Sequence, residues 1–203
     1  MKNRFKSGLA ALASLLVFSL TTNAQTVDKK AATTDDKPKW IYSVGVDAGI
    51  PIGDFHDYYD WSLGGSLEAN LAIIQRKLYV SLNAGYSNVF AKDDVVPGVK
   101  GQDLSLIPIK AGLRYYPFNT VSKLYVQGLA GVSILANKSD VGADKSAAFA
   151  YAPQIGYLFQ LGKNHNYLDV AVKWEGTSKF ADGDASEYNN LGLHVAYAFG
   201  SKK

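Results

Sequence analysis

The sequence has 203 residues, a length that suits a single domain. It contains no cysteine, which excludes disulfide bonds, thiolate metal sites, a cysteine nucleophile and a lipid-modified N-terminal cysteine. The formal net charge of +3 comes from Lys2, Arg4 and Lys6, because without these three of the 21 basic residues 18 remain against 18 acidic ones. A balanced charge gives no electrostatic footprint for nucleic acid, and we predict no nucleic-acid partner.

The first 24 residues have the pattern of an export signal. The basic start is followed by an apolar run over residues 9–20, and residues 22–24 (Thr-Asn-Ala) resemble a small-residue cleavage site. The apolar run is too short to cross a bilayer as a helix, and an uncleaved membrane anchor is the alternative. We therefore predict a cleaved signal peptide over residues 1–24.

Residues 25–39 are polar and charged and show no apolar periodicity. Such composition predicts a flexible segment, which we interpret as a periplasmic tail. Ordered structure is expected from Trp40 onward, with one β-barrel domain over residues 40–200. No segment after residue 24 contains 18 consecutive apolar residues, so a transmembrane helix is not expected there.

From Trp40 onward, apolar residues alternate with polar or small ones in eight successive segments. The segments cover residues 40–50, 61–73, 78–87, 107–115, 124–134, 149–161, 168–175 and 190–199. A strand that crosses a membrane at a tilt needs about 9–11 residues, whereas soluble sandwich strands average about 5–6. Strand length and the even strand number predict an all-β fold, an eight-stranded antiparallel up-and-down transmembrane β-barrel.

The connections between these segments alternate in length and in charge. Short turns are expected at residues 75–77, 117–123 and 162–166, and long loops at residues 53–60, 91–103, 137–147 and 176–187. The long loops carry eleven acidic and five basic residues, and the short turns carry four basic residues and no acidic one. Short periplasmic turns that alternate with longer outer loops are typical of outer-membrane barrels. Aromatic residues near both strand ends, Tyr116 among them, indicate two interfacial girdles.

In a membrane barrel the apolar face points to lipid and the polar face points into the lumen. The lumen-facing positions here are mostly small, which suits the narrow interior of eight strands. The larger polar residues on this face are Asp47, Glu68, Lys110, Arg114, Gln154, Asp169, Lys173, Glu175 and His194. We predict that they form a near-neutral layer of ion pairs that fills the lumen, in which Lys110 neutralises Asp47 or Glu68.

Three stretches carry a resemblance to a known family: VGVDAGIPIGDF (44–55), LIPIKAGLRYYPFNTVSKLYVQGLAGVSI (106–134) and LGLHVAYAF (191–199). They resemble the small bacterial outer-membrane β-barrel proteins of the OmpA/OmpX and PorT-like kind, over essentially the whole mature chain. The resemblance implies a bacterial outer-membrane location and insertion by the barrel-assembly machinery, which reads an alternating last strand that ends in an aromatic residue. That signal is carried here by Leu191, Leu193, Val195, Tyr197 and Phe199. The family supplies no common catalytic site.

The candidates for catalysis or metal binding are few. His194 is alone on the lumen face, His56 lies in an acidic loop, and His165 lies in a short turn, so none has the partners of a metal site or a catalytic group. Residues 182–187 resemble part of a calcium loop but lack its remaining ligands. We interpret them as a solvated acidic loop, with weak cation bridging to lipopolysaccharide phosphates as the alternative. No catalytic residue, metal site or cofactor is predicted.

These patterns predict a non-enzymatic outer-membrane barrel with a filled lumen and a structural or surface-interaction role through its acidic outer loops. Three alternatives are a narrow channel for ions or small solutes, an accessory component of a secretion system, and a lipid-modifying barrel enzyme. The expected partners are membrane lipid and lipopolysaccharide, together with the assembly machinery during insertion. The expected state is a monomer.

Overall fold

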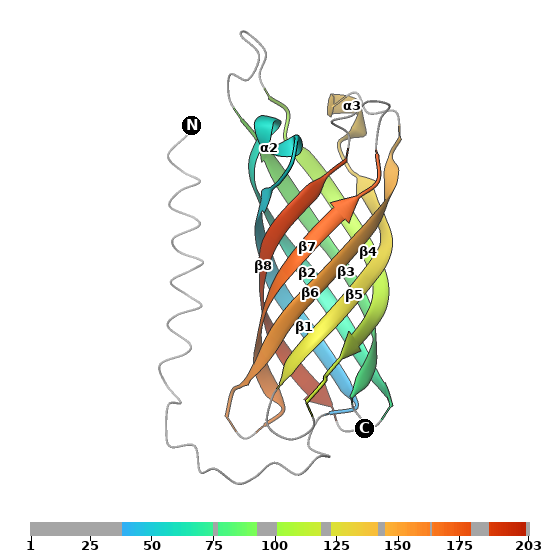
Figure 1. Cartoon of the computed structure of the whole chain (residues 1–203), viewed down its shortest axis with the longest axis vertical. Coiled ribbons are helices and arrows are strands. Elements are labelled where there is room, and N and C mark those ends of the chain that lie inside the picture. The colour runs from blue at the N-terminus through green and yellow to red at the C-terminus, as the bar shows by residue number, and fades with distance from the viewer. Residues whose placement is uncertain are drawn as a thin grey trace. The chain divides into compact units, whose positions relative to one another are not determined.

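The computed structural model describes residues 38–74, 77–92, 101–118, 123–141, 145–162, 164–179 and 187–201. Within these ranges, eight antiparallel strands form one closed barrel in which each strand pairs with the next and β8 pairs with β1 (Figure 1). The strands are β1 (Trp40–Pro51), β2 (Tyr59–Ile74), β3 (Leu78–Ala91), β4 (Leu104–Tyr115), β5 (Leu124–Leu135), β6 (Ala147–Gln160), β7 (Asn166–Thr177) and β8 (Asn189–Ser201). The predicted fold is confirmed. The expected signal peptide, and the expected tail up to residue 37, lie outside the described residues.

The two ends of the barrel differ in their connections. At one end, here the turn end, β2, β4 and β6 lead into the next strand by short segments. The other end, here the loop end, carries the longer connections, with the short helices α2 (Phe55–Tyr58) and α3 (Lys138–Val141) (Figure 1). Neither helix was expected. Among the described residues, no helix combines the length and the apolar character needed to cross a bilayer.

Several strands extend further toward the loop end than the apolar alternation predicts. The pairing of β2 with β3 continues to Tyr59 and Ala91, and β4 begins at Leu104. The Asp103 carboxylate accepts a hydrogen bond from the backbone N–H of Ala91 at 2.9 Å. The difference arises because main-chain pairing does not require apolar side chains, so a strand can continue past the end of its hydrophobic pattern.

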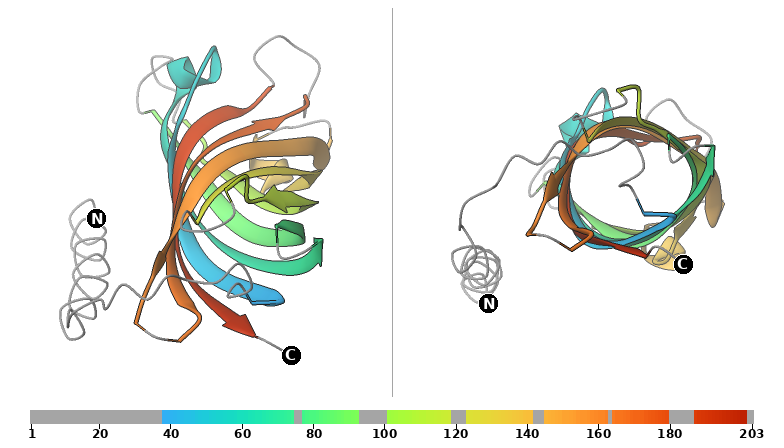
Figure 2. Two further views of the ribbon diagram at one scale, coloured as in Figure 1. Left: turned by 60° about the horizontal axis from the view of Figure 1, so that its bottom comes forward. Right: turned by 90° about the horizontal axis from the view of Figure 1, so that it is seen from below.

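The outward face of the barrel is apolar on every strand. Exposed examples, one from each strand, are Val44, Leu67, Leu82, Ile109, Val132, Ile155, Val172 and Leu193. The inward face combines small residues with the charged residues described below. The view along the barrel shows the closed ring of strands that separates these two faces (Figure 2). An apolar exterior around a polar interior is the reverse of a soluble barrel and matches a barrel that spans a membrane.

Glycine on the inward face allows neighbouring strands to approach each other closely within the barrel wall. A Cβ atom on Gly131 would lie 2.1 Å from the carbonyl oxygen of Ile109, and one on Gly45 would lie 2.5 Å from the Cβ atom of Ala196. Both contacts are too short for any side chain. The small inward residues noted in the sequence are therefore required by the geometry of the wall.

Two strands contain an internal proline, and each proline lies beside a gap in the strand pairing. The β3–β4 register passes from Ala84–Ile109 to Ser87–Leu106 without the two pairs between, next to Pro108. The β6–β7 register similarly omits the partners of Ala152 and Pro153. Proline has no N–H to donate, which explains a local loss of ladder hydrogen bonds.

Candidate functional site

Side chains from all eight strands meet inside the barrel and form four successive groups. Two groups of charged and polar side chains lie in the middle, and an apolar group lies toward each end of the barrel. On β4, Arg114 belongs to the charged group nearer the turn end and Lys110 to the one nearer the loop end. On β7, Asp169 and Glu175 are divided between the groups in the same way. We name these groups the turn-side and loop-side ion clusters.

The turn-side ion cluster is built around Arg114, which is fully buried. Its guanidinium contacts two carboxylates, with Nη2 at 2.7 Å from Glu68 Oε1 and Nη1 at 3.1 Å from Asp169 Oδ2. Its Nε donates to Gln127 Oε1 at 2.8 Å, and Cζ lies 3.8 Å from the centre of the Tyr125 ring. Arginine suits this position because its planar fork donates several hydrogen bonds in fixed directions.

This cluster has two carboxylates and a single guanidinium, and neutral donors surround the carboxylates. Glu68 accepts hydrogen bonds from the amides of Gln127 at 3.0 Å, Asn70 at 2.9 Å and Asn83 at 3.4 Å. Asp169 accepts one from the Tyr125 hydroxyl at 2.7 Å. Hydrogen bonds to a carboxylate offset part of its desolvation, so these donors compensate for the second negative charge.

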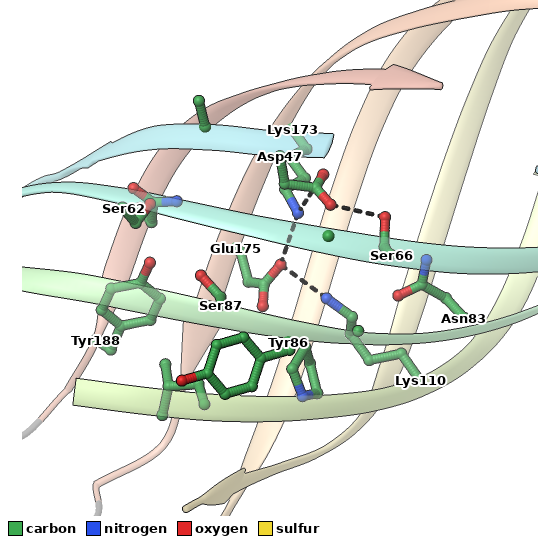
Figure 3. Close-up of a pocket in the computed structure, with 16 residues that line it drawn as sticks. Asp47, Ser62, Ser66, Asn83, Tyr86, Ser87, Lys110, Lys173, Glu175 and Tyr188 are labelled. Atoms are coloured by element: carbon green, nitrogen blue, oxygen red, sulfur yellow. Dashed lines mark hydrogen bonds and ion pairs between the residues drawn. The ribbon is translucent and has the colours of Figure 1, made fainter. Parts of the chain in front are cut away.

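The loop-side ion cluster contains two lysines and two carboxylates joined in a chain. Lys110 Nζ lies 2.7 Å from Glu175 Oε2, and the same oxygen is 3.1 Å from Lys173 Nζ. Lys173 also contacts Asp47 Oδ1 at 2.9 Å. Asp47 is held further by Ser66 Oγ at 2.7 Å and by His194 Nδ1 at 2.9 Å. Figure 3 shows Lys110, Glu175, Lys173, Asp47 and Ser66 along this chain.

An apolar cluster lies inside the barrel toward the turn end. Its members are Ile41, Tyr79, Tyr116, Tyr125, Leu158, Tyr167, Ala171 and Ala198, all buried. The Tyr79 and Tyr116 rings pack edge to face with centroids 5.5 Å apart. The Tyr79 hydroxyl donates to the carbonyl of Pro38 at 2.8 Å, and Pro38 is itself fully buried. The segment that leads into β1 therefore packs against this cluster.

A second apolar cluster lies inside the barrel toward the loop end. It consists of Phe55, Val89, Leu104, Leu106, Leu135, Ala148 and Tyr188. Phe55 comes from α2 and packs against Tyr59 at 4.7 Å and Tyr188 at 5.5 Å between ring centroids. Burial, together with the nearby Glu175 carboxylate, raises the pKa of Tyr188 well above its usual value, so the hydroxyl stays protonated.

A small polar cavity borders the loop-side ion cluster (Figure 3). Besides the ion-pair residues, its lining includes Ser62, Ser87, Tyr188 and Asn190. The volume open to the centre of a water molecule is about 20 Å³. One water requires about 10–15 Å³ by the same measure, so the cavity has room for one or two waters. Within the described residues, the buried Oδ1 of Asn190 has no hydrogen-bond donor, and such a water would supply one.

All nine lumen residues singled out in the sequence lie inside the barrel, and seven of them are buried. The pairing differs from the expectation in one respect, since Lys110 contacts Glu175 and makes no ion pair with Asp47 or Glu68. The reason is that the strands are staggered. Ser43, and not Asp47, lies opposite Glu68, so position counted from each strand end does not give height in the lumen.

The aromatic residues of the two apolar clusters were not predicted from the sequence as part of the interior. Tyr116 was assigned to an interfacial girdle, but its side chain is fully buried in the turn-side apolar cluster. Tyr79, Tyr125 and Tyr167 lie at inward positions of their strands, and strand parity could have identified them. Phe55 carried no such signal, because α2 interrupts the alternation.

The remaining predicted residues lie outside this interior. In β8, Leu191, Leu193, Tyr197 and Phe199 are exposed on the outer face and Val195 is partly exposed, and the strand continues two residues past Phe199. The backbone carbonyl of His56, on α2, accepts a hydrogen bond from Lys92. His165 Nδ1 lies 3.4 Å from the Tyr167 hydroxyl. Among the described residues, no three His, Asp or Glu side chains are placed to hold a metal ion. Most of residues 182–187 lie outside the described ranges.

The closed eight-stranded barrel, apolar outside and ionic inside, has the architecture of a small membrane-spanning barrel. Known structures share this fold. Outer membrane protein OprG from Pseudomonas aeruginosa matches with a TM-score of 0.50 and 16% identity over 84% of this chain and 100% of that one. Yersinia pestis outer membrane protein Ail in a phospholipid bilayer nanodisc matches with a TM-score of 0.52 and 15% identity over 80% and 100%. At the level of the fold, the predicted resemblance to small outer-membrane barrels is confirmed. No protein-family model and no curated protein matches the sequence.

Proposed function

We propose that this protein is a non-enzymatic β-barrel of a bacterial outer membrane whose lumen is closed and whose role lies at its outer surface. The observation that supports the proposal is the position of two ion clusters inside the barrel, between two apolar clusters. With the lumen occupied, the loop end is the part of the barrel available to other molecules. Its connections are rich in acidic residues, which suits a structural or surface-interaction role in the envelope.

The partners that we propose follow from the positions of the outer face, the loop end and the last strand. The apolar outer face supports contact with membrane lipid, and the loop end would stand among lipopolysaccharide molecules. The exposed side chains of β8 support recognition of the last strand by the barrel-assembly machinery. We propose that the barrel acts as a monomer.

A narrow channel for ions or small solutes is the second candidate, and the polar cavity beside Lys110 is the observation that favours it. Single-channel recording in planar lipid bilayers distinguishes the two. A closed lumen predicts no conductance steps from the wild-type protein. It also predicts that steps appear when the interior is emptied by combining Phe55→Ala, Tyr188→Ala, Arg114→Ala and Tyr79→Ala. Steps from the wild-type barrel would contradict the closed lumen and support the channel.

The proposed location in an outer membrane can be tested separately. A folded outer-membrane barrel migrates differently on a denaturing gel before and after boiling, and we expect such a shift here. A protein recovered from the soluble periplasmic fraction without this shift would contradict the proposal. Mass analysis of lipid A with and without the gene tests the absence of lipid-modifying activity, and copurification tests a role in a secretion system.

A further inference from the structure

The lipid-facing wall contains a groove across β4, β5, β6 and β7. It is a shallow depression with a volume of about 540 Å³, most of it open to the surroundings of the barrel. Its outward-facing lining residues are Leu113, Tyr115, Val126, Gly128, Pro153, Ile155, Val172 and Trp174. Every one of them is apolar or aromatic. The outward-facing lining of the groove is therefore predominantly apolar.

The depression exists because one side chain is missing from a cross-strand row. Leu113, Gly128 and Pro153 are register partners on β4, β5 and β6. A Cβ atom on Gly128 would meet no other atom within 4 Å, so the space above this residue is open. The neighbouring side chains of Val126 and Ile155 stand out from the surface, since both are almost half exposed. Val126 and Ile155 are register partners of each other, so together they form one wall of the groove, on the turn side of Gly128.

No charged side chain lies within the groove. Gln127, Gln154 and Lys173 also border it, but their side chains point into the lumen. There Gln154 donates to Gln127 at 2.7 Å, and Lys173 is held by its two carboxylates. Apart from the Tyr115 hydroxyl and the Trp174 indole N–H, the outward-facing lining has no polar side-chain group, so the walls match the apolar chain of a lipid.

The size and position of the groove select among possible occupants. A stable protein dimer buries about 1,200–2,000 Å² in total, far more than a depression one side chain wide contributes. A lipid acyl chain is narrow enough to lie above Gly128. One end of the groove is at Tyr115, the last residue of β4 at the turn end. In an outer membrane this end meets the periplasmic leaflet, which holds phospholipid.

We propose that this groove is a binding site for one acyl chain of a phospholipid from the leaflet at the turn end of the barrel. The chain enters beside Tyr115 and lies over Gly128 and Pro153 toward Trp174. The proposal rests on the proposed function, because it requires the outer face of the barrel to contact lipid.

Gly128→Leu tests the site by filling it, and Gly65→Leu is the matched control. Gly65 also faces outward, on β2, and a Cβ atom there would meet only the Gly45 carbonyl oxygen at 3.6 Å, an ordinary contact. Each full-length mature protein is inserted into nanodiscs of phosphatidylethanolamine and phosphatidylglycerol. Native mass spectrometry then counts the phospholipid molecules that stay bound after release. We expect one phospholipid on the wild type and on Gly65→Leu, and about tenfold less on Gly128→Leu, equivalent to about 1.4 kcal/mol.

Fluorescence supplies a second readout at the site itself. With Trp40 and Trp61 replaced by phenylalanine, Trp174 is the single tryptophan, and phospholipid with brominated acyl chains should quench it less in Gly128→Leu than in Gly65→Leu. Equal retention and equal quenching in the two variants would overturn the groove. A dimer lost only in Gly128→Leu would overturn the acyl-chain occupant. Insertion is checked on the same samples by the heat-dependent gel shift, so failure to insert contradicts the proposed function, whereas an inserted barrel without bound lipid contradicts the groove alone.

Discussion

Arg114 contacts both carboxylates of the turn-side ion cluster and is only 1% exposed. Desolvation makes a buried charge costly unless it is paired and hydrogen-bonded. Removing the guanidinium therefore leaves the Glu68 and Asp169 carboxylates without a cation. The neutral donors around them compensate for one negative charge and not for two. Breaking such a network by removing one partner therefore lowers the free energy of unfolding by more than the intact network contributes to it.

Arg114→Met is accordingly expected to destabilise the barrel by about 3–5 kcal/mol, the range for breaking a buried ion pair. Urea unfolding in lipid vesicles measures this change. Arg114→Lys keeps the charge but loses the fork, and we expect an intermediate loss of stability. Adding Glu68→Gln to Arg114→Met should recover part of the loss. An unfolding midpoint that Arg114→Met leaves unchanged would contradict the cluster.

Lys110→Met tests the loop-side ion cluster, and the expected effect is smaller. Glu175 loses the contact at 2.7 Å but keeps Lys173 at 3.1 Å, so no carboxylate is left without a cation. We expect a cost of about 1–3 kcal/mol, typical of a lost hydrogen bond to a buried charged group. The same unfolding measurement compares the two variants. A loss for Lys110→Met that equals or exceeds the loss for Arg114→Met would show that Lys173 does not compensate.

At the scale of elements, the strands could be predicted from the sequence because alternation is a local property. β1 begins at Trp40 as expected, and each of the other strands overlaps its predicted segment. The partner of Lys110 could not be predicted, since it depends on the stagger between strands that are distant in the chain. The position of Phe55 could not be predicted from the sequence either, because it depends on a single helical turn that packs over the loop end.

Pro153 gives a testable account of the gap between β6 and β7. If the missing N–H causes the gap, Pro153→Val restores a donor and should slow amide hydrogen exchange at residues 150–155 and 173–177. Ile155→Val, on the same strand and face, is the matched control and should leave exchange unchanged. Unaltered exchange in Pro153→Val would assign the gap to another cause, such as the curvature of the wall.

At the scale of the whole molecule, the placement of polar and apolar side chains is reversed relative to a soluble protein. The interior holds ion pairs, and the exterior holds exposed leucine, isoleucine and valine on all sides. In water this surface would drive aggregation, whereas in a bilayer it is matched to its solvent. Because of this reversal, a charged substitution on the outer surface should change the stability of the barrel far more than it would in a soluble protein. Such a substitution therefore tests the membrane environment directly.

Leu67 lies near the middle of β2 and is 62% exposed. In a soluble protein, replacing so exposed a residue with arginine changes stability by less than about 0.5 kcal/mol. On the lipid face near the bilayer midplane, the same change costs about 2–4 kcal/mol. We therefore expect Leu67→Arg to destabilise the barrel in phospholipid vesicles by that larger amount. Tyr58→Arg is the control, because Tyr58 is 47% exposed but lies on α2 beyond the strands. If the two variants unfold at the same urea concentration, the apolar wall does not face lipid and the membrane assignment fails.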